Sequence, residues 1–325
     1  MKEVNVAVIG TGAWGKNHAR VFYELENAHL VAVCDINEER AKSIATKYNA
    51  EYFTNFEDIL RRADIEAVSI ATPTTTHYSI VEKALDYNKK VLVEKPIAST
   101  IEEAKKIANR IKKENHFLMV GFISRFDPSL SLVKEIIRSG KIGKIVHLYA
   151  RRVGPFWPER VGDIGVIKDV ALHDIDLFRY YIDSNPISVY TIAGSLRHKY
   201  EDYASIIMKF ENDISAIIEA NWITPHKKRE INVTGANGIL LVDIMTQEVQ
   251  LESEQWIMKS KTHWKEPLKL ELAAFINAII NDKDPPVTAT DGLIALAIAE
   301  AALQSSREGI PVRTDRLIRE ILNSK

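Results

Sequence analysis

The stretch VNVAVIGTGAWG, residues 4–15, decides the fold of this 325-residue chain. Val4–Ile9 is a continuous apolar run, which is typical of a strand buried inside a parallel sheet. The next six residues, GTGAWG, match the pattern G-x-G-x-x-G and open a helical pattern. In that context the first glycine permits a tight turn, the second lets the backbone approach a pyrophosphate, and the third allows the helix to pack closely on the strand.

An acidic residue follows at the distance that a dinucleotide-binding unit requires. Asp35 ends a second apolar run, Leu30–Cys34, 20 residues after the last of these glycines. A carboxylate there accepts the ribose hydroxyls of an adenosine and repels a 2′-phosphate. The next residues, Ile36 and Asn37, add no cation, so the pattern favours NAD over NADP, with Arg40 as the side chain that could still reach a phosphate. The alternative is an ordinary strand, turn and helix with a surface aspartate.

Strand and helix patterns alternate as far as residue 121. The expected strands after the first two are 67–71, 91–94 and 117–121, and the expected helices are 15–26, 37–48, 77–88 and 101–115. Alternation of this kind indicates βαβ units and a parallel sheet. We therefore expect a doubly wound α/β domain of the Rossmann type over residues 1–121.

Beyond residue 121 the pattern changes. A strand at 145–152 and four further extended stretches, 187–194, 202–210, 215–222 and 230–235, have few helices between them, and Asn237-Gly238 is a hairpin signal before 239–243. Helices are expected at 128–140, 166–181, 268–281 and 292–306. This run predicts an α+β domain with an open antiparallel sheet over residues 122–325.

Composition excludes several classes of protein. Hydrophobic residues make up 46% of the chain and charged residues 27%, as in globular proteins. The net charge of -1 lacks the basic excess expected of a nucleic-acid binder. The one cysteine, Cys34, excludes an intrachain disulfide framework and a Cys-rich zinc site. No stretch reaches the ~18 apolar residues of a membrane span. We expect a cytoplasmic protein that binds neither nucleic acid nor membrane.

Polar residues mark the ends of two later strands. Ala71-Thr72-Pro73-Thr74 ends one, and ligands of open α/β sheets bind at the carboxyl ends of strands. We expect these residues to contact the cofactor; the alternative is a loop with a threonine cap. Lys95 ends another strand, between Glu94 and Pro96. It could polarise a substrate oxygen, either protonated or with a lowered pKa, or it could be a surface lysine at a turn.

A second set of titratable residues lies in the helical pattern 166–181. Asp169 and His173 are four residues apart and Asp176 follows three later, so on an α-helix they share one face. His173 could take a hydroxyl proton at neutral pH, and Asp169 could fix its tautomer. The set could also bind a metal, although Lys95 would supply the electrophile that a metal provides, or it could be a solvated face.

The loop between Gly154 and Gly165 is rich in aromatic residues and arginines. It contains the run PFWP, residues 155–158, and Arg160, and it follows Arg151 and Arg152. These residue types suit an anionic, ring-bearing ligand, and they equally suit an oligomer contact.

Together these segments resemble the Gfo/Idh/MocA family of sugar and cyclitol dehydrogenases over nearly the whole chain. The resemblance rests on the glycine turn, Asp35 and the strand ends, on Gly121-Phe122 with Arg125, and most specifically on GVIKDVALHDID, residues 165–176. It implies that Lys95, Asp169 and His173 are catalytic, that Asp176 contacts substrate, and that Pro96 follows a bond that is often cis. It also implies a homodimer or homotetramer.

The motifs and the resemblance assign two sets of ligand contacts and no metal site. The expected NAD contacts are Gly10, Thr11, Gly12, Ala13, Trp14, Gly15, Asp35, Ile36, Ala71, Thr72, Pro73, Thr74, His77, Glu94, Lys95 and Arg125. The expected substrate contacts are Lys95, Arg152, Trp157, Arg160, Asp169, His173 and Asp176.

Within the family, two stretches look like UDP-N-acetylglucosamine 3-dehydrogenases of archaeal type: GTGAWGKNHAR with the later CDINEERA, and VGPFWPERVGDIGVIKDVALHDID. The resemblance therefore implies NAD-dependent oxidation of the sugar 3-hydroxyl to a ketone. The chain departs from the family at Ile164-Gly165, where a Gly-Gly pair is common. The alternatives are an inositol or simple-sugar dehydrogenase and a non-catalytic NAD-binding regulator. The regulator would keep the glycine turn but would have no need of Lys95 together with His173.

Overall fold

The computed structural model describes residues 3–156, 163–261 and 263–323, and it divides into two compact units. The first comprises Met1–Ile123 and Leu268–Leu293, and the second comprises Ser124–Pro267 and Ile294–Lys325. The chain thus enters the first unit a second time, through a stretch that the sequence-based division placed in the second domain.

Aromatic packing explains this return. Helix α8 (Pro267–Ile280) places Phe275 against Phe22 and Phe117, with ring centroids 6.4 and 5.8 Å apart. The apolar spacing of α8 shows that one side must be buried, but not which sheet it covers. Its partners lie more than 150 residues earlier in the chain, beyond the reach of local periodicity.

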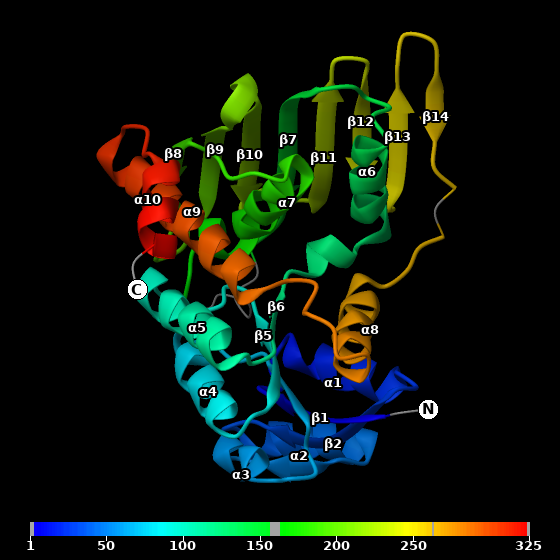
Figure 1. Cartoon of the computed structure of the whole chain (residues 1–325), viewed down its shortest axis with the longest axis vertical. Coiled ribbons are helices and arrows are strands. Elements are labelled where there is room, and N and C mark those ends of the chain that lie inside the picture. Colours follow the sequence, from blue (N-terminus) through cyan, green and yellow to red (C-terminus); the bar gives the residue numbers. More distant parts are fainter. Residues whose placement is uncertain (1–2, 157–162, 262, 324–325) are drawn as a thin grey trace. The chain divides into compact units, whose positions relative to one another are not determined.

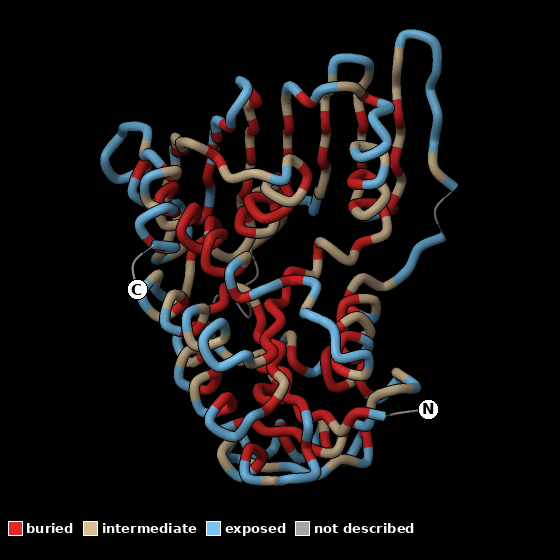
Figure 2. The backbone as a smooth tube through the Cα atoms, in the orientation of Figure 1, coloured by how far each residue is buried: buried red, intermediate tan, exposed pale blue. Residues whose placement is uncertain are grey.

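The first unit is built on a six-stranded sheet whose neighbouring strands all pair in parallel (Figure 1). The order β3-β2-β1-β4-β5-β6 is that of a Rossmann fold, so the expected architecture is confirmed. The strands are β1 (Val4–Ile9), β2 (Ala28–Cys34), β3 (Glu51–Phe53), β4 (Ala67–Ile70), β5 (Lys90–Glu94) and β6 (Leu118–Gly121). Strands β1, β4, β5 and β6 consist mainly of buried residues, in keeping with their apolar runs, whereas β3 has none (Figure 2).

Five further helices connect these strands: α1 (Gly15–Glu24), α2 (Glu38–Tyr48), α3 (Phe56–Leu60), α4 (Thr74–Asp86) and α5 (Ile101–Glu114). Their ends follow local rules. Thr100 and Glu103 form a capping box at the start of α5, and Asn115 ends it in the left-handed conformation. The sequence analysis did not anticipate β3 and α3, which have only three and five residues.

The second unit contains an eight-stranded sheet in the order β14-β13-β12-β11-β7-β10-β9-β8 (Figure 1). Its strands are β7 (Ile145–Val153), β8 (Ser188–Gly194), β9 (Tyr203–Lys209), β10 (Ser215–Asn221), β11 (Lys228–Gly235), β12 (Gly238–Asp243), β13 (Glu248–Glu252) and β14 (Ile257–Lys259). The expectation of a wholly antiparallel sheet is wrong at one pair, because β10 runs parallel to β7. The chain passes through a helix, β8 and β9 before β10 returns beside β7, and the sheet is therefore mixed.

Helices cover one face of this sheet. The helical segments are η1 (Ile123–Phe126), α6 (Pro128–Arg138), η3 (Ile167–Ala171), α7 (Leu172–Ile182), η4 (Glu211–Asp213), α9 (Ala289–Glu308) and α10 (Thr314–Asn323). Helix α6 packs on β12 and β13, and α7 packs on β7 and β10. Strand β9 accordingly alternates between buried residues and exposed ones, such as Ile206 and Ile207. Within the described ranges, no helix is long and apolar enough to cross a membrane.

Candidate active site

The backbone of the glycine turn in the first unit explains why glycines occupy this motif. Gly10 has a φ of 89°, which L side chains rarely adopt, and a Cβ on Gly15 would lie 1.7 Å from the carbonyl oxygen of Gly10. A Cβ on Gly12 would instead meet only a guanidinium nitrogen of Arg40, at 3.9 Å, among the described atoms. The backbone at Gly12 is therefore open to a close-lying group.

The start of α1 and the end of β2 complete this cradle. Trp14, at the start of α1, forms no capping hydrogen bond through its side chain, so the helix can direct backbone N–H groups to an anion. Asp35 accepts hydrogen bonds from the backbone N–H and the hydroxyl of Thr11, at 2.9 and 3.1 Å. The next residue, Ile36, is 94% exposed. A backbone cradle, an anchored carboxylate and an exposed apolar side chain match the phosphates, ribose and adenine of NAD.

Arg40, the residue that left NADP open, is 3.3 Å from Asp35 in an ion pair. Its guanidinium is thus held by the carboxylate that discriminates against a 2′-phosphate. The side chain of Arg40 is half exposed, so this pair contributes little to stability. The guanidinium of Arg40 and the carboxylate of Asp35 neutralise each other in this pair.

Two further strand ends meet at the same edge of the parallel sheet. A Cβ on Gly10 would contact the carbonyl of Ala71 at 2.7 Å, so the turn after β1 lies against the end of β4. His77 of α4 is buried, and its two ring nitrogens lie 2.8 Å from the carbonyl oxygen of Pro96 and 2.9 Å from that of Thr72. It holds the loop after β4 to the loop after β5, where the Lys95–Pro96 bond is cis.

A buried hydrogen-bond network surrounds Glu94, the residue before Lys95. Its carboxylate accepts hydrogen bonds from the Trp14 indole at 2.8 Å and the backbone N–H of Lys95 at 3.2 Å, and it lies 3.1 Å from Nε2 of His18. The other ring nitrogen of His18 lies 2.8 Å from the Ser69 hydroxyl. Burial alone would raise the pKa of Glu94, but His18, Lys95 and Trp14 hold it below its ordinary value. Glu94 is therefore a fixed anion behind Lys95.

A second carboxyl group, Glu271 of α8, is buried in the same unit. Neither of its oxygens has a hydrogen-bond partner among the described residues, and the residue is fully buried. Burial, together with the charge of Glu94, raises the pKa of Glu271 well above 4.5. Burial of Glu271 therefore favours its protonated form. The sequence analysis missed it, as it missed His18 and Ser69.

In the second unit, Asp169 and His173 do not lie on one continuous α-helix as expected. Asp169 belongs to η3, a π-helical turn, and His173 belongs to α7, which begins at Leu172. The i→i+5 bonding of a π turn changes the angle between successive side chains, so the argument from four-residue spacing does not apply to Asp169. Such turns occur frequently at functional sites. Both residues are half-buried.

Three predicted ligand contacts form ion pairs within the second unit. Arg125 donates two hydrogen bonds to Asp176, at 2.6 and 2.7 Å. Arg152 is buried and holds Asp174 through three contacts between 2.7 and 3.2 Å. Both are the two-point geometry that makes arginine–carboxylate pairs strong. The guanidinium of Arg152, expected to bind substrate, is thus neutralised inside the fold.

A cavity of about 240 Å³ lies at the ends of β7 and β10. Asp169, Val170 and Arg152 line it, together with Val153, Gly154, Pro155, Asn221, Trp222, Lys227 and Arg229. Two basic residues of this cavity, Lys227 and Arg229, were not anticipated. They lie in HKKRE, residues 226–230, a continuous polar run at the start of β11 that carries no motif, and only the folded chain places them in one cavity with Asp169.

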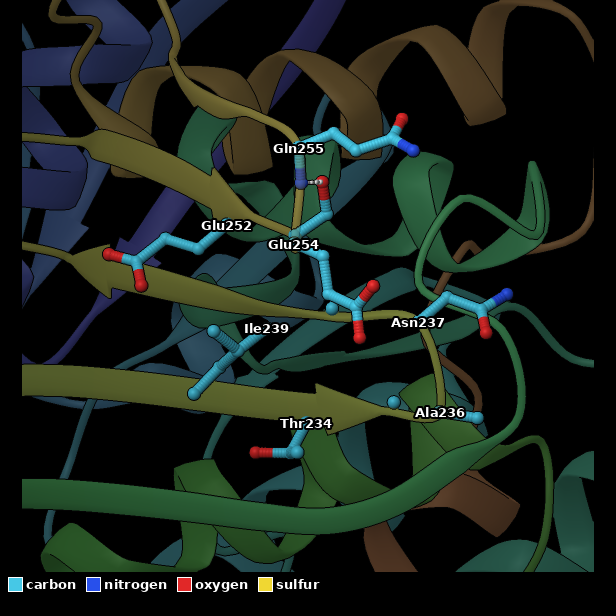
Figure 3. Close-up of a pocket in the computed structure, with 10 residues that line it drawn as sticks. Thr234, Ala236, Asn237, Ile239, Glu252, Glu254 and Gln255 are labelled. Atoms are coloured by element: carbon cyan, nitrogen blue, oxygen red, sulfur yellow. Dashed lines mark hydrogen bonds between the residues drawn. The ribbon is translucent and has the colours of Figure 1, made fainter.

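A larger and more open hollow of about 670 Å³ lies at the other end of the sheet, where the β11–β12 and β13–β14 turns meet (Figure 3). Glu252, Glu254 and Asn237 line it. It contains none of the predicted site residues, and its carboxylates do not suit a phosphate.

The structure thus groups the predicted residues by unit. The first unit brings the glycine turn, Asp35, the residues 71–74, His77, Glu94 and Lys95 to the carboxyl edge of its sheet. The second places Asp169 and His173 on consecutive helical segments, with Arg152 beside Asp169 in the cavity. Trp157 and Arg160 lie outside the described residues. Among the residues that are described, no group of three His, Cys, Asp or Glu side chains is placed to hold a metal ion.

Two family models match this chain. Residues 4–122 match the oxidoreductase family with an NAD-binding Rossmann fold, GFO_IDH_MocA, and residues 130–241 match the GFO/IDH/MocA C-terminal domain.

Named relatives match along nearly the full length. The chain is 30% identical to the scyllo-inositol 2-dehydrogenase (NAD(+)) of Bacillus subtilis, over 96% of this chain and 97% of the relative. It is 27% identical to the UDP-N-acetylglucosamine 3-dehydrogenase of Acidithiobacillus ferrooxidans, over 94% and 96%. A solved structure of the latter enzyme, GnnA, superposes with a TM-score of 0.87 at 26% identity, covering 95% of this chain and 99% of that one.

Proposed function

Because this chain belongs to the Gfo/Idh/MocA family of oxidoreductases and is an NAD-dependent dehydrogenase of sugars or polyols, we propose that it oxidises the 3-hydroxyl of UDP-N-acetylglucosamine to a ketone. The observation that carries the proposal is that one chain contains both a built dinucleotide cradle and the set Lys95, Asp169 and His173. A non-catalytic NAD-binding regulator would need the cradle but would have no need of these three residues.

The first unit holds the cofactor. The open backbone at Gly12 and the start of α1 face the pyrophosphate, and Asp35 accepts the ribose hydroxyls. When bound, NAD+ supplies the acceptor for the hydride that leaves the substrate carbon. The fixed anion of Glu94 accepts a hydrogen bond from the backbone N–H of Lys95 and so holds the backbone at this residue.

The catalytic residues divide the remaining work on the substrate hydroxyl. His173 accepts the hydroxyl proton, and Asp169 fixes the tautomer of its ring and stabilises the resulting cation. Lys95 donates a hydrogen bond to the same oxygen and stabilises the negative charge that develops there. Positioned acid–base groups of this kind contribute about 10²–10⁴-fold to the rate.

The nucleotide sugar is supported by the relative from Acidithiobacillus ferrooxidans and by the basic residues of the cavity that Asp169 lines. A neutral cyclitol is the second candidate. The scyllo-inositol 2-dehydrogenase, at 30% identity, favours it.

The test is the rate of NADH formation with UDP-N-acetylglucosamine, free N-acetylglucosamine, myo-inositol and scyllo-inositol. We expect UDP-N-acetylglucosamine to have the highest kcat/KM. Faster oxidation of an inositol would replace it with the second candidate. NAD binding without oxidation of any member of the panel would favour the regulator.

A further inference from the structure

We propose that Glu201 is a positioning residue for Asp169, because it anchors the start of the π-helical turn η3 to which Asp169 belongs. This inference rests on the proposed function, since it assigns the residue that holds one of the proposed catalytic groups in place. Glu201 lies between β8 and β9, and both it and η3 belong to the second unit. No sequence motif singled it out, because its side-chain contact with η3 joins residues 34 positions apart.

The backbone and the side chain of Glu201 both accept hydrogen bonds at the start of η3. Its carbonyl oxygen accepts one from the backbone N–H of Val166 at 2.9 Å, and its Oε1 atom accepts one from the backbone N–H of Ile167 at 3.1 Å. The first N–H groups of a helix have no partner inside it, and a polar side chain just before the helix usually satisfies one. Val166, which precedes η3, has no such side chain. Glu201 therefore supplies the cap that the neighbouring sequence lacks.

Gly165 shows how closely the carboxyl group fits against this turn. A Cβ on Gly165 would lie 2.1 Å from Cδ of Glu201 and 2.2 Å from each of its carboxyl oxygens, so no side chain can share this space. The carbonyl oxygen of Gly165 in turn accepts a hydrogen bond from the backbone N–H of Asp169 at 2.9 Å. A continuous series of contacts thus joins the Glu201 carboxyl group through Gly165 to Asp169, which lines the cavity of about 240 Å³.

The next residue, Asp202, fixes the backbone from which Glu201 extends. Asp202 is buried, and its carboxylate accepts hydrogen bonds from the backbone N–H groups of Leu196 at 3.0 Å and Arg197 at 2.6 Å. Its carbonyl oxygen accepts one from the backbone N–H of Trp222, just after β10, at 2.8 Å. A buried polar network whose members are satisfied is rigid. Glu201 therefore reaches η3 from a fixed point of the backbone.

The contact requires an acceptor oxygen at the right distance rather than a charge. Burial raises the pKa of Glu201 above its ordinary value of 4.5, whereas the Ile167 N–H and the nearby ammonium of Lys168 act in the opposite direction. A backbone N–H can donate to an uncharged carbonyl oxygen instead of a carboxylate. Glutamine therefore keeps the acceptor atom at the same reach without the charge, whereas aspartate keeps the charge but is one methylene shorter. The two substitutions separate position from electrostatics.

The test measures kcat and KM for Glu201→Ala, Glu201→Asp and Glu201→Gln with the substrate of the panel that is oxidised fastest. Glu201→Ala and Glu201→Asp should lower kcat by about 10–100-fold with a much smaller change in KM, because a small misplacement of a catalytic group can cost such a factor. Glu201→Gln should retain most of the rate. Glu254→Ala, at an exposed glutamate beside the larger hollow of the same unit, should match the wild type.

A double-mutant cycle shows whether Glu201 acts through Asp169. In an Asp169→Ala background, Glu201→Ala should lower kcat little further, because the group that it positions is gone. Single effects that multiply in the double variant would overturn the positioning role. A rate that is lost in Glu201→Gln and retained in Glu201→Asp would also overturn it, since the charge of Glu201 and not its reach would then matter.

Hydrogen exchange of the amides of residues 166–169 gives a readout that is independent of turnover. Exchange should be faster than in the wild type in Glu201→Ala and Glu201→Asp but not in Glu201→Gln or Glu254→Ala. Unchanged exchange, or faster exchange with unchanged kcat, overturns the positioning role alone. Circular dichroism checks that each variant is folded, and Glu201→Asp carries the test if Glu201→Ala does not fold.

Failure of the proposed function gives different results. Oxidation of an inositol in place of UDP-N-acetylglucosamine overturns the proposed substrate and leaves the positioning role standing. An unchanged kcat in Asp169→Ala overturns both the catalytic assignment and the positioning role. If no member of the panel is oxidised, the proposed function fails and the exchange rates alone decide whether Glu201 anchors η3.

Discussion

The charged groups of the two units are arranged in opposite ways. In the first, the buried anion of Glu94 is surrounded by donors from His18, Trp14 and the Lys95 backbone. In the second, the cavity beside Asp169 collects more positive than negative charge. A satisfied buried network holds a group rigidly in place. The comparison leads us to expect that the first unit holds the cofactor-binding groups rigidly and that the second selects the substrate.

The largest expected effect comes from removing one residue of the proposed catalytic set, Lys95 or His173. Lys95→Ala and His173→Ala should each lower kcat by about 10²–10⁴-fold, because each group acts on the oxygen whose charge changes during the reaction. NADH absorbance measures the rate, and calorimetry with NAD+ serves as the control, since His173→Ala should bind the cofactor normally. A kcat that survives either substitution removes that residue from the mechanism.

The next largest effect concerns stability. Breaking a buried ion pair of the second unit should lower the free energy of unfolding more than breaking a half-exposed one. Arg152→Met leaves Asp174 buried without this counter-charge and should lower the free energy of unfolding by about 3–5 kcal/mol. Arg151→Met disrupts a half-exposed pair with Glu219 and should cost about 0–1 kcal/mol. Urea denaturation compares the two variants. Equal losses would show that the burial of the Arg152–Asp174 pair has no energetic consequence.

The glycine turn should separate cofactor binding from stability. Gly15→Ala forces a Cβ against the Gly10 carbonyl and should lower stability by about 1–3 kcal/mol, as overpacking does, and weaken NAD binding as well. Gly12→Ala adds a Cβ to open space, so it should weaken NAD binding with an almost unchanged melting temperature. Thermal unfolding with and without NAD+ measures both. If Gly12→Ala destabilises the free protein as much as Gly15→Ala does, the separate roles of Gly12 in cofactor binding and Gly15 in packing are contradicted.

The smallest effect is a pH dependence of stability in the first unit. The pKa of Glu271 is raised above its ordinary value of 4.5 by burial and by the charge of Glu94. Its contribution to stability is therefore complete below pH 4.5 and is lost as the pH rises toward the folded-state pKa. Glu271→Gln cannot ionise, so its melting temperature should exceed that of the wild type by a margin that grows with pH. The exposed Glu66→Gln is the control, and a margin independent of pH would contradict the buried, protonated carboxyl.

Sequence reasoning recovered the parts of the molecule that depend on local rules. Residues 4–15 predicted the first strand, turn and helix because the motif, the apolar run and the left-handed Gly10 are properties of neighbouring residues. The mixed sheet could not be predicted, since the parallel pairing of β10 with β7 depends on how all the helices and strands between them fold. The same holds for Glu271, which lies near Glu94 only because α8 returns to the first sheet.

The candidate site shows the same division. Lys95, Asp169 and His173 stand in short motifs, so their residue types and spacing indicated chemistry. Lys227 and Arg229 stand in no motif, and only the folded chain places them in one cavity with Asp169. Arg152 itself was predicted as a substrate contact because it precedes a loop rich in aromatic residues and arginines, but its buried partner Asp174 could be recognised only in the folded chain. A charged residue in the sequence therefore indicates a ligand site less reliably than the same residue considered together with its ion-pair partner in the folded chain.

The most direct test of the account is a double-mutant cycle between Lys95 and His173, one from each unit, measured as kcat/KM with the substrate of the panel that is oxidised fastest. If both groups act on one hydroxyl oxygen, the double alanine variant should be little slower than the slower single variant, because groups that act as a unit are strongly non-additive. If the two single effects multiply in the double variant, the residues act independently and the two units do not share one reaction centre.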